Sequence, residues 1–246
     1  MVNNWVDMGL LTARSIAGAV WRVDLSEVPE RTGGRRAAAP RRRLTPAERL
    51  PQILEAALEE FAAEGYGGAS MAGAAARAGI AKGLIYHYFP GKAELFTAVV
   101  RSCIQPVFAE AEKLVAAHAG PSAELLQRLI QLGYQRVGAD PRDSLVFKLL
   151  LAEAEHFPEL GELYRTEVLS PGLALVTAVM RTGVAAGEFR PEVAEVEGLA
   201  AVLMAPVAMA SVWRGMLGAE RAPSLGAMCA AQVSLVLSGL TRTGPG

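Results

Sequence analysis

The chain has 246 residues, 52% of them hydrophobic and 20% charged, and a formal net charge of −1. This is enough apolar material for one large domain or two small ones, but no window of about 20 residues is apolar throughout, which argues against a transmembrane helix. The two cysteines, Cys103 and Cys229, lie far apart, so we expect neither a disulfide framework nor a zinc site, and a cytoplasmic location.

The first 44 residues have the composition of an extension rather than of a folded domain. Residues 27–45 combine proline, glycine and arginine without apolar periodicity, which is typical of a flexible arm. Six arginines and no acidic residue fall between positions 31 and 45, so any attraction to a polyanion is concentrated there. Before the arm, apolar residues at roughly helical spacing indicate either a short amphipathic helix or an extension translated from an upstream start codon.

A long helix is predicted to follow the arm. Thr45 can cap it, Pro46 suits its first position, and Glu48 stands where a capping box needs an acid. Apolar residues then recur at helical spacing along one face, as far as Gly65, where we expect the helix to end.

Two short helices and another long one come next. Ser70 can cap the first, which Gly79 ends; the second covers residues 82–88, and Lys92 begins the long helix. No strand-like alternation of useful length occurs, so the sequence predicts an all-α protein. Further amphipathic helices are expected at about 122–138, 142–156, 159–186, 192–217 and 223–241.

The two short helices, joined by the turn AGIA after a longer helix, are typical of a helix-turn-helix motif. In that motif the second short helix enters the major groove of DNA. Lys82 can reach a base edge or a phosphate, Gly83 lets the backbone approach, and Tyr86 and His87 carry hydrogen-bonding tips that suit phosphate oxygens. Lys92 adds a cation at a helix N-terminus. Core packing is the expected role of three neighbours: Ile85, Tyr88 and Phe89.

Residues 65–96, GYGGASMAGAAARAGIAKGLIYHYFPGKAELF, resemble the DNA-binding domain of the TetR family of transcriptional regulators. The resemblance covers residues 45–95 and is specific in its motif. A weaker likeness to the family's C-terminal domain follows at FPEL (157–160) and GEFR (187–190). The family implies an extension (1–44), a three-helix helix-turn-helix domain (45–95) and a helical effector-binding and dimerisation domain (96–246).

The resemblance also implies which residues touch DNA. Ser70 would cap the second helix and help to hold a phosphate, and the arginine arm would reach along the DNA, including its minor groove. The implied DNA-binding residues are Arg41, Arg42, Arg43, Ser70, Lys82, Gly83, Leu84, Tyr86, His87 and Lys92.

Three positions depart from the family pattern. Ala81 replaces the usual capping serine, which removes a cap worth about 0.5–2 kcal/mol. Gly73 and Ala74 replace larger residues, so we expect the second helix to be less helix-prone, by about 1 kcal/mol for the glycine, and more shallowly packed.

The last two predicted helices are apolar on too many faces for an exposed monomer helix. Pairing of these helices in a homodimer would bury them and would place two recognition helices about 34–36 Å apart, which suits a near-palindromic operator. The candidate interface residues are Val202, Met209, Val212, Met228, Val233 and Val236.

An effector pocket among the central helices is expected from the resemblance, and the scarcity of buried charges indicates an apolar or amphipathic effector. Glu153, Glu155 and His156 could line a polar end, although a position on the helix surface is the alternative. Ordinary core packing is the alternative for each of the candidate lining residues, Phe108, Tyr134, Phe147, Leu151, Tyr164, Val168 and Met180.

Catalysis is not expected. The three histidines show no metal-ligand spacing, and the sequence has neither a glycine-rich phosphate loop nor a nucleophile elbow. We therefore expect no cofactor and no metal. The resemblance implies a repressor that its effector releases from DNA, since this is the commonest mode in the family. The alternative is a helical carrier of lipids or acyl groups that retains a vestigial helix-turn-helix.

Overall fold

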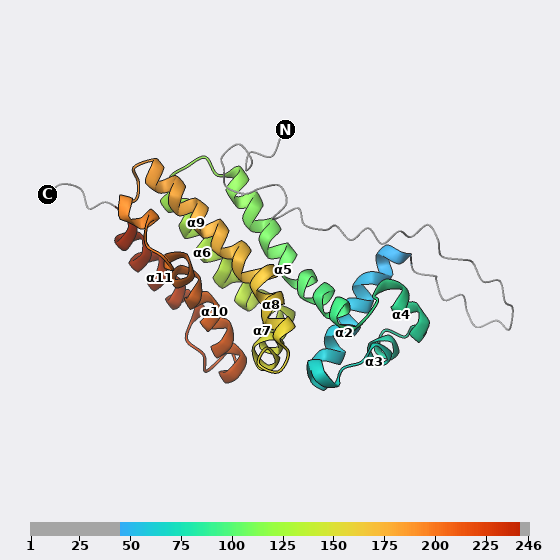
Figure 1. The fold of residues 1–246 in the computed structure, drawn as a ribbon. Coiled ribbons are helices and arrows are strands. Elements are labelled where there is room, and N and C mark those ends of the chain that lie inside the picture. Colours follow the sequence, from blue (N-terminus) through green and yellow to red (C-terminus); the bar gives the residue numbers. More distant parts are fainter. Residues whose placement is uncertain (1–44, 242–246) are drawn as a thin grey trace, which may run out of the picture. The chain divides into compact units, whose positions relative to one another are not determined.

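A computed structural model of the protein describes residues 45–241, and nearly all of this part is helical (Figure 1). The expected all-α class is confirmed. The chain divides into two compact units, whose described parts are residues 45–99 and residues 100–241. The division falls inside one long helix, so this helix belongs to both units.

The first unit contains three helices and the start of a fourth. Thr45 caps the first: its hydroxyl accepts a hydrogen bond from the Glu48 amide (3.3 Å), and the Glu48 carboxylate accepts one from the Thr45 amide (2.9 Å). The predicted capping box is confirmed. The helices are α2 (Pro46–Gly68), α3 (Met71–Arg77), α4 (Lys82–Tyr88) and α5 (Lys92–Ala117).

The break expected at Gly65 is confirmed, since Gly65 has a φ of 68° and interrupts the helix there. A last turn then follows, so that α2 extends to Gly68. Glycine tolerates this left-handed conformation because it has no Cβ. Gly79, which ends α3, has a φ of 64° for the same reason.

An aromatic cluster forms the centre of the first unit. The rings of Phe61, Tyr66 and Phe96 lie with their centroids between 4.8 and 6.0 Å apart, and each side chain is buried. Ile85 and Phe89 are also buried, as expected from the sequence, and Tyr88 is half-buried. This core fixes one face of the short helix α4.

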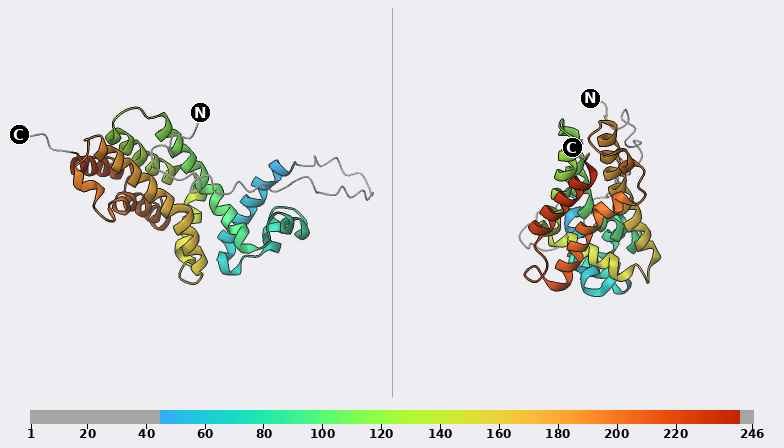
Figure 2. Two further views of the ribbon diagram at one scale, coloured as in Figure 1. Left: turned by 45° about the horizontal axis from the view of Figure 1, so that its top comes forward. Right: turned by 90° about the vertical axis from the view of Figure 1, so that its left-hand side faces the viewer.

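The second unit consists of the rest of α5 and a group of packed helices (Figure 2). Within it, α6 packs against α9, α10 and α11. The helix expected at 159–186 is divided by one π-helical turn, and the helix expected at 192–217 begins only at residue 199. After α5, the second unit contains α6 (Ser122–Ala139), α7 (Pro141–Glu153), α8 (Pro158–Tyr164), η2 (Arg165–Leu169), α9 (Ser170–Ala185), η3 (Pro191–Ala194), α10 (Leu199–Leu217) and α11 (Leu225–Leu240).

The GEFR segment, residues 187–190, turns the chain after α9. Gly187 has a φ of 75°, which allows the turn. The Phe189 ring is 1% exposed and lies on Gly183 of α9, where a Cβ would come within 2.3 Å of the ring. A glycine at position 183 is therefore required by this packing.

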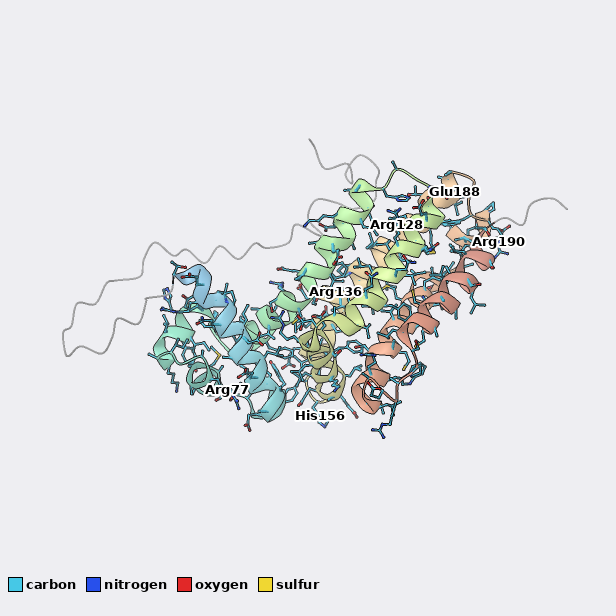
Figure 3. All side chains as sticks on the ribbon, turned by 180° about the vertical axis from the view of Figure 1, so that it is seen from behind. Arg77, Arg128, Arg136, His156, Glu188 and Arg190 are labelled. Atoms are coloured by element: carbon cyan, nitrogen blue, oxygen red, sulfur yellow. The ribbon has the colours of Figure 1, made fainter. Side chains whose placement is uncertain are left out.

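The charged residues of the same segment bind two further helices (Figure 3). The Glu188 carboxylate accepts a hydrogen bond from the Ala123 amide at the start of α6 (3.2 Å). The Arg190 amide donates to the Leu240 carbonyl (2.9 Å), and its guanidinium donates to the Gly239 carbonyl at the end of α11. This segment thus ties together the ends of α6, α9 and α11.

Two helical stretches, Pro158–Ala185 and Leu199–Leu217, are long and apolar enough to cross a membrane by length and composition alone. Core helices of soluble proteins share these properties. Leu175 and Val179 of the first stretch, and Leu203 and Ala210 of the second, are buried within the second unit. Packing in the core accounts for part of their apolar composition.

Candidate nucleic-acid interface

The predicted contact residues of α4 lie on one exposed face of this helix. Lys82, Gly83, Tyr86 and His87 are exposed, whereas Ile85 points into the core and is 0% exposed. The spacing of the four exposed residues gathers them within one side of the helix, as helical periodicity requires. The structure thus brings these four candidates together; Leu84, the fifth on α4, is half-buried at the margin of this face.

The start of α4 lacks a side-chain cap. Ala81 has extended backbone angles (φ −65°, ψ 140°) and makes no capping hydrogen bond from its side chain. The loss predicted from the replacement of the usual serine is confirmed. By contrast, the Ser70 hydroxyl caps α3 as expected, because it accepts a hydrogen bond from the Gly73 amide (2.9 Å).

Lys92 has partners within its own unit. Its ammonium donates hydrogen bonds to the carbonyls of Tyr66 (2.7 Å) and Gly67 (3.0 Å) in the last turn of α2. The same group lies 4.9 Å from the centre of the Tyr66 ring, in a cation–π arrangement. Lys92 therefore ties the start of α5 to the end of α2, a role that local spacing did not predict, and its contact with DNA remains a prediction.

Glu60 and Arg77 form a contact beside the helix-turn-helix that the sequence reasoning missed. Glu60 is 6% exposed, and its carboxylate accepts hydrogen bonds from the Arg77 guanidinium (2.7 Å) and the Ser70 amide (3.2 Å). The hydrogen bond from Arg77 lowers the pKa of Glu60, against the effect of its burial. The available signal was the acid itself, which follows Ile53 and Ala57 on the apolar face of α2.

Gly73 of α3 faces this carboxylate. A Cβ at position 73 would lie 1.8 Å from the Glu60 Oε1 atom. The expectation of shallower packing around Gly73 is therefore corrected: the space is filled by the Glu60 carboxylate, and Ala74 beside it is 1% exposed.

The three arginines of the arm, Arg41, Arg42 and Arg43, lie outside the described residues. Their contact with DNA remains a prediction from the resemblance and from the charge of the segment.

The effector candidates fall into three groups in the second unit. Tyr134 and Met180 are buried in the apolar core, and the Tyr134 hydroxyl donates to the buried Gln232 amide oxygen (2.8 Å). Leu151 is 55% exposed. The remaining four are all half-buried, and we call them the half-buried set: Phe108, Phe147, Tyr164 and Val168.

A partly buried ion pair joins α6 and α7 in the second unit. The Arg136 guanidinium is 3.3 Å from the Asp143 carboxylate, and its Nε atom is buried without a hydrogen-bond partner among the described residues. Burial raises the pKa of Asp143, which Arg136 partly opposes. Glu155 and His156 are exposed at the end of α7, in agreement with the alternative of a surface position.

The dimer candidates separate by helix. On α10, exposed apolar residues follow one another at intervals of three or four, and we call this row the α10 stripe: Val202, Ala205, Met209, Trp213 and Met216. Val212 beside it is half-buried. On α11, Met228, Val233 and Val236 are half-buried and contact the core of their own unit. Their part in a dimer interface remains a prediction, because α11 is apolar on most faces and its periodicity does not single out one side.

Two family models match the chain. The model described as "Bacterial regulatory proteins, tetR family" matches residues 53–99, and "Tetracyclin repressor-like, C-terminal domain" matches residues 132–225.

Among the described residues, no group of three or more histidines, cysteines or acids could hold a metal ion.

A curated relative matches the chain in part. The chain is 42% identical over 81 residues to the HTH-type transcriptional activator FasR of Mycolicibacterium smegmatis. The matched region covers 32% of this chain and 37% of FasR. The chain thus spans little more than a third of the length of this relative.

Solved structures share the fold over most of the chain. A regulator from Saccharomonospora viridis in complex with choline is 21% identical, with a TM-score of 0.63 over 80% of this chain and 99% of that one. FadR from Bacillus subtilis in complex with stearoyl-CoA is 20% identical, with a TM-score of 0.57 over 77% and 98%. At such identities the likeness concerns the fold alone. Since both family models match in chain order on this helical fold, the chain belongs to the TetR family of bacterial transcriptional regulators.

Proposed function

We propose that this regulator binds a near-palindromic operator as a homodimer and that a small apolar or amphipathic molecule releases it. The observation that carries the proposal is the exposed face of α4, where Lys82, Gly83, Tyr86 and His87 stand together on a helix whose opposite face is buried. A cation, a bare backbone position and two hydrogen-bonding tips are the groups that contact phosphates and base edges.

The α10 stripe supports the homodimer. Val202 is 66% exposed and Met216 is 73% exposed, and an apolar row of this length marks an interaction surface rather than a solvated face. On α11, the exposed face is built mainly from small residues, which let helices approach closely; they are Ala227, Ala230, Ala231, Ser234 and Ser238.

The half-buried set supports an apolar or amphipathic effector. Phe147 and Tyr164 lie with ring centroids 5.9 Å apart, and burial raises the pKa of Tyr164, which describes an apolar environment. Arg136 could serve the polar end of such a molecule through its unpartnered Nε atom. Two ligands named in similar solved structures, stearoyl-CoA and choline, are suitable first probes because one is amphipathic and the other is a small cation.

The test is fluorescence anisotropy of the purified protein on DNA from upstream of its own gene and on a shuffled duplex, each at two salt concentrations. A duplex selected by the protein from a random library serves as a further substrate. We expect preference for the native or selected duplex, loss of it in Tyr86→Ala, and release by stearoyl-CoA but not by choline. Weak, equal and salt-sensitive binding to every duplex would contradict a sequence-specific regulator and would favour the acyl-carrier alternative.

The arm and the sign of regulation have their own tests. Deletion of residues 31–43 should lower affinity for all DNA sequences and flatten the salt dependence. Each phosphate contact releases counterions from the DNA, so fewer contacts mean fewer released counterions and a weaker dependence on salt. In a purified transcription assay we expect the protein to reduce transcription from its operator. An increase would make it an activator, as FasR is described to be.

A further inference from the structure

A carboxylate lies inside the first unit, where apolar packing would be expected. Glu60 is 6% exposed and shares the inner face of α2 with Ile53 and Ala57, which are both 0% exposed. A buried charge is costly unless it is paired and hydrogen-bonded. The contacts of this carboxylate therefore indicate what it does.

The Glu60 carboxylate holds both ends of α3. One oxygen accepts a hydrogen bond from the Ser70 amide at the start of α3 (3.2 Å), and the other accepts one from Arg77 in its last turn (2.7 Å). Helix α3 has seven residues, and so short a helix has little stability of its own. Its placement on α2 thus depends on contacts such as these.

Gly73 makes this arrangement possible. A Cβ at position 73 would lie 1.8 Å from one Glu60 oxygen, 2.3 Å from its carboxyl carbon and 2.6 Å from the other oxygen. Any side chain at position 73 would therefore force the Glu60 carboxylate to move, and this movement would disturb its hydrogen bonds to α3. Glu60 and Gly73 are therefore sterically coupled.

We infer that Glu60 is a positioning residue for DNA binding, together with Gly73 and Arg77. By fixing α3 at both ends, the carboxylate fixes the turn at Gly79 and the orientation of α4, which follows that turn and packs against α3. This inference rests on the proposed function, since it assigns the groups that orient the DNA-contacting helix.

Positioning and simple electrostatics predict opposite results when the charge is removed. If Glu60 acted only as a negative charge near DNA, Glu60→Gln would bind every duplex more tightly. If Glu60 positions α3, the same substitution loosens the hold on Arg77 and weakens binding to the preferred duplex selectively. Glu59, the exposed neighbour, provides the matched control, because Glu59→Gln removes the same charge without these contacts.

The first experiment compares wild type, Glu60→Gln and Glu59→Gln by anisotropy on the duplex that wild type binds best and on its shuffled form. It is run at a temperature where circular dichroism shows all three proteins folded. We expect Glu60→Gln to lower the ratio of the two affinities by about tenfold, the effect of losing one good hydrogen bond to a charged group, and Glu59→Gln to keep it. An unchanged ratio in Glu60→Gln would overturn the inference, whereas no preference in wild type would overturn the proposed function itself.

The second experiment needs no DNA. Thermal unfolding is measured for Gly73→Ala, Glu60→Ala and the double variant. We expect Gly73→Ala to lower the midpoint by about 5 °C or more in the wild-type background, and to leave it unchanged or raise it in the Glu60→Ala background, because alanine is the better helix former. Additive effects would contradict the coupling, and the inference with it.

Discussion

The two units of this chain use different interactions to place their helices. In the first, polar contacts between a side chain and the backbone help to place the helices: Glu60 to Ser70 at the short helix α3, and Lys92 to Tyr66 and Gly67 between α5 and α2. In the second, long helices pack through apolar faces, and α10 leaves one apolar stripe uncovered. A short helix buries too little surface to fix its own position, so directional contacts take over.

This difference has a functional counterpart. A DNA-contacting helix has to be held at a defined angle, and hydrogen bonds with specific geometry do this better than apolar contacts. A dimerising helix instead needs a large apolar surface that a second copy can cover. The following predictions test how far the contrast holds.

The largest effect is expected at the apolar contact where the second unit turns after α9. Phe189→Ala removes a ring that is 1% exposed and should lower the free energy of unfolding by about 3–5 kcal/mol. Urea denaturation at fixed protein concentration measures this value. Leu151→Ala, at a site 55% exposed, is the control and should change the free energy of unfolding by less than about 0.5 kcal/mol. A loss in Phe189→Ala as small as that in the control would mean that packing at Phe189 is unimportant.

The α10 stripe is expected to show the next largest effect. Val202→Glu should raise the dimer dissociation constant at least about tenfold, because it buries a charge in an apolar interface. Sedimentation velocity over a concentration series measures this constant. Val196→Glu, at a residue 53% exposed outside the stripe, should leave the dimer intact, and dissociation by both variants would contradict the assignment of the interface to α10.

Lys92 and Lys82 test the polar side of the comparison. Lys92→Met keeps the apolar stem but removes two hydrogen bonds to carbonyls, so we expect a loss of about 1–3 kcal/mol in the free energy of unfolding. Lys82→Met, on the exposed face of α4, should change stability by less than about 0.5 kcal/mol while weakening DNA binding. If Lys92→Met unfolds like wild type, Lys92 acts only through DNA.

The ion pair of Glu60 predicts a dependence of stability on pH. The pKa of Glu60 is lowered from its ordinary value of 4.5 in the folded protein, so its stabilising contribution is complete above pH 4.5. This contribution is lost as the pH falls through the folded pKa, where the native carboxylate takes up a proton. The midpoint of thermal unfolding is measured for wild type and for Glu60→Gln between pH 7 and pH 3. The difference between the two midpoints should become smaller at acid pH, and a constant difference would contradict the pairing.

The smallest effect is expected at the uncapped start of α4. Ala81→Ser restores a hydroxyl at a residue with extended backbone angles and should stabilise the first unit by about 0.5–1 kcal/mol. Ser70→Ala, which removes the existing cap of α3, should change stability by a similar amount in the opposite direction. Thermal unfolding measures both, and no gain in Ala81→Ser would mean that the start of α4 is already satisfied.

Much of the first unit could be read from the sequence, because its signals are local. The capping box at Thr45, the cap at Ser70, the bounds of α4 and the inward position of Ile85 depend on residues within four positions of one another. The break at Gly65 is local as well, since it needs only a glycine that adopts a positive φ, although one more turn follows it. The roles of Lys92 and Glu60 could not be read, because their partners lie 10 to 26 positions away.

The second unit was harder to read for a different reason. Its helices were located well, yet apolar residues on most faces of α10 and α11 left their orientation open. Met228, Val233 and Val236 are half-buried against the core of their own unit, while Trp213, Met216 and Leu235 are exposed. The expected pocket residues divided in the same way, with Tyr134 and Met180 in the core.

The sequence by itself determined the helical class, the helix-turn-helix and the exposed face of α4, because capping and periodicity act over a few residues along the chain. Only the tertiary structure decided which apolar faces are covered, which polar groups meet, and why position 73 holds a glycine. Those outcomes depend on segments that are distant in sequence and adjacent in space. A Cβ at Gly73 is harmless within its own helix and clashes only because the Glu60 carboxylate, 13 positions earlier, occupies the same space and would have to move.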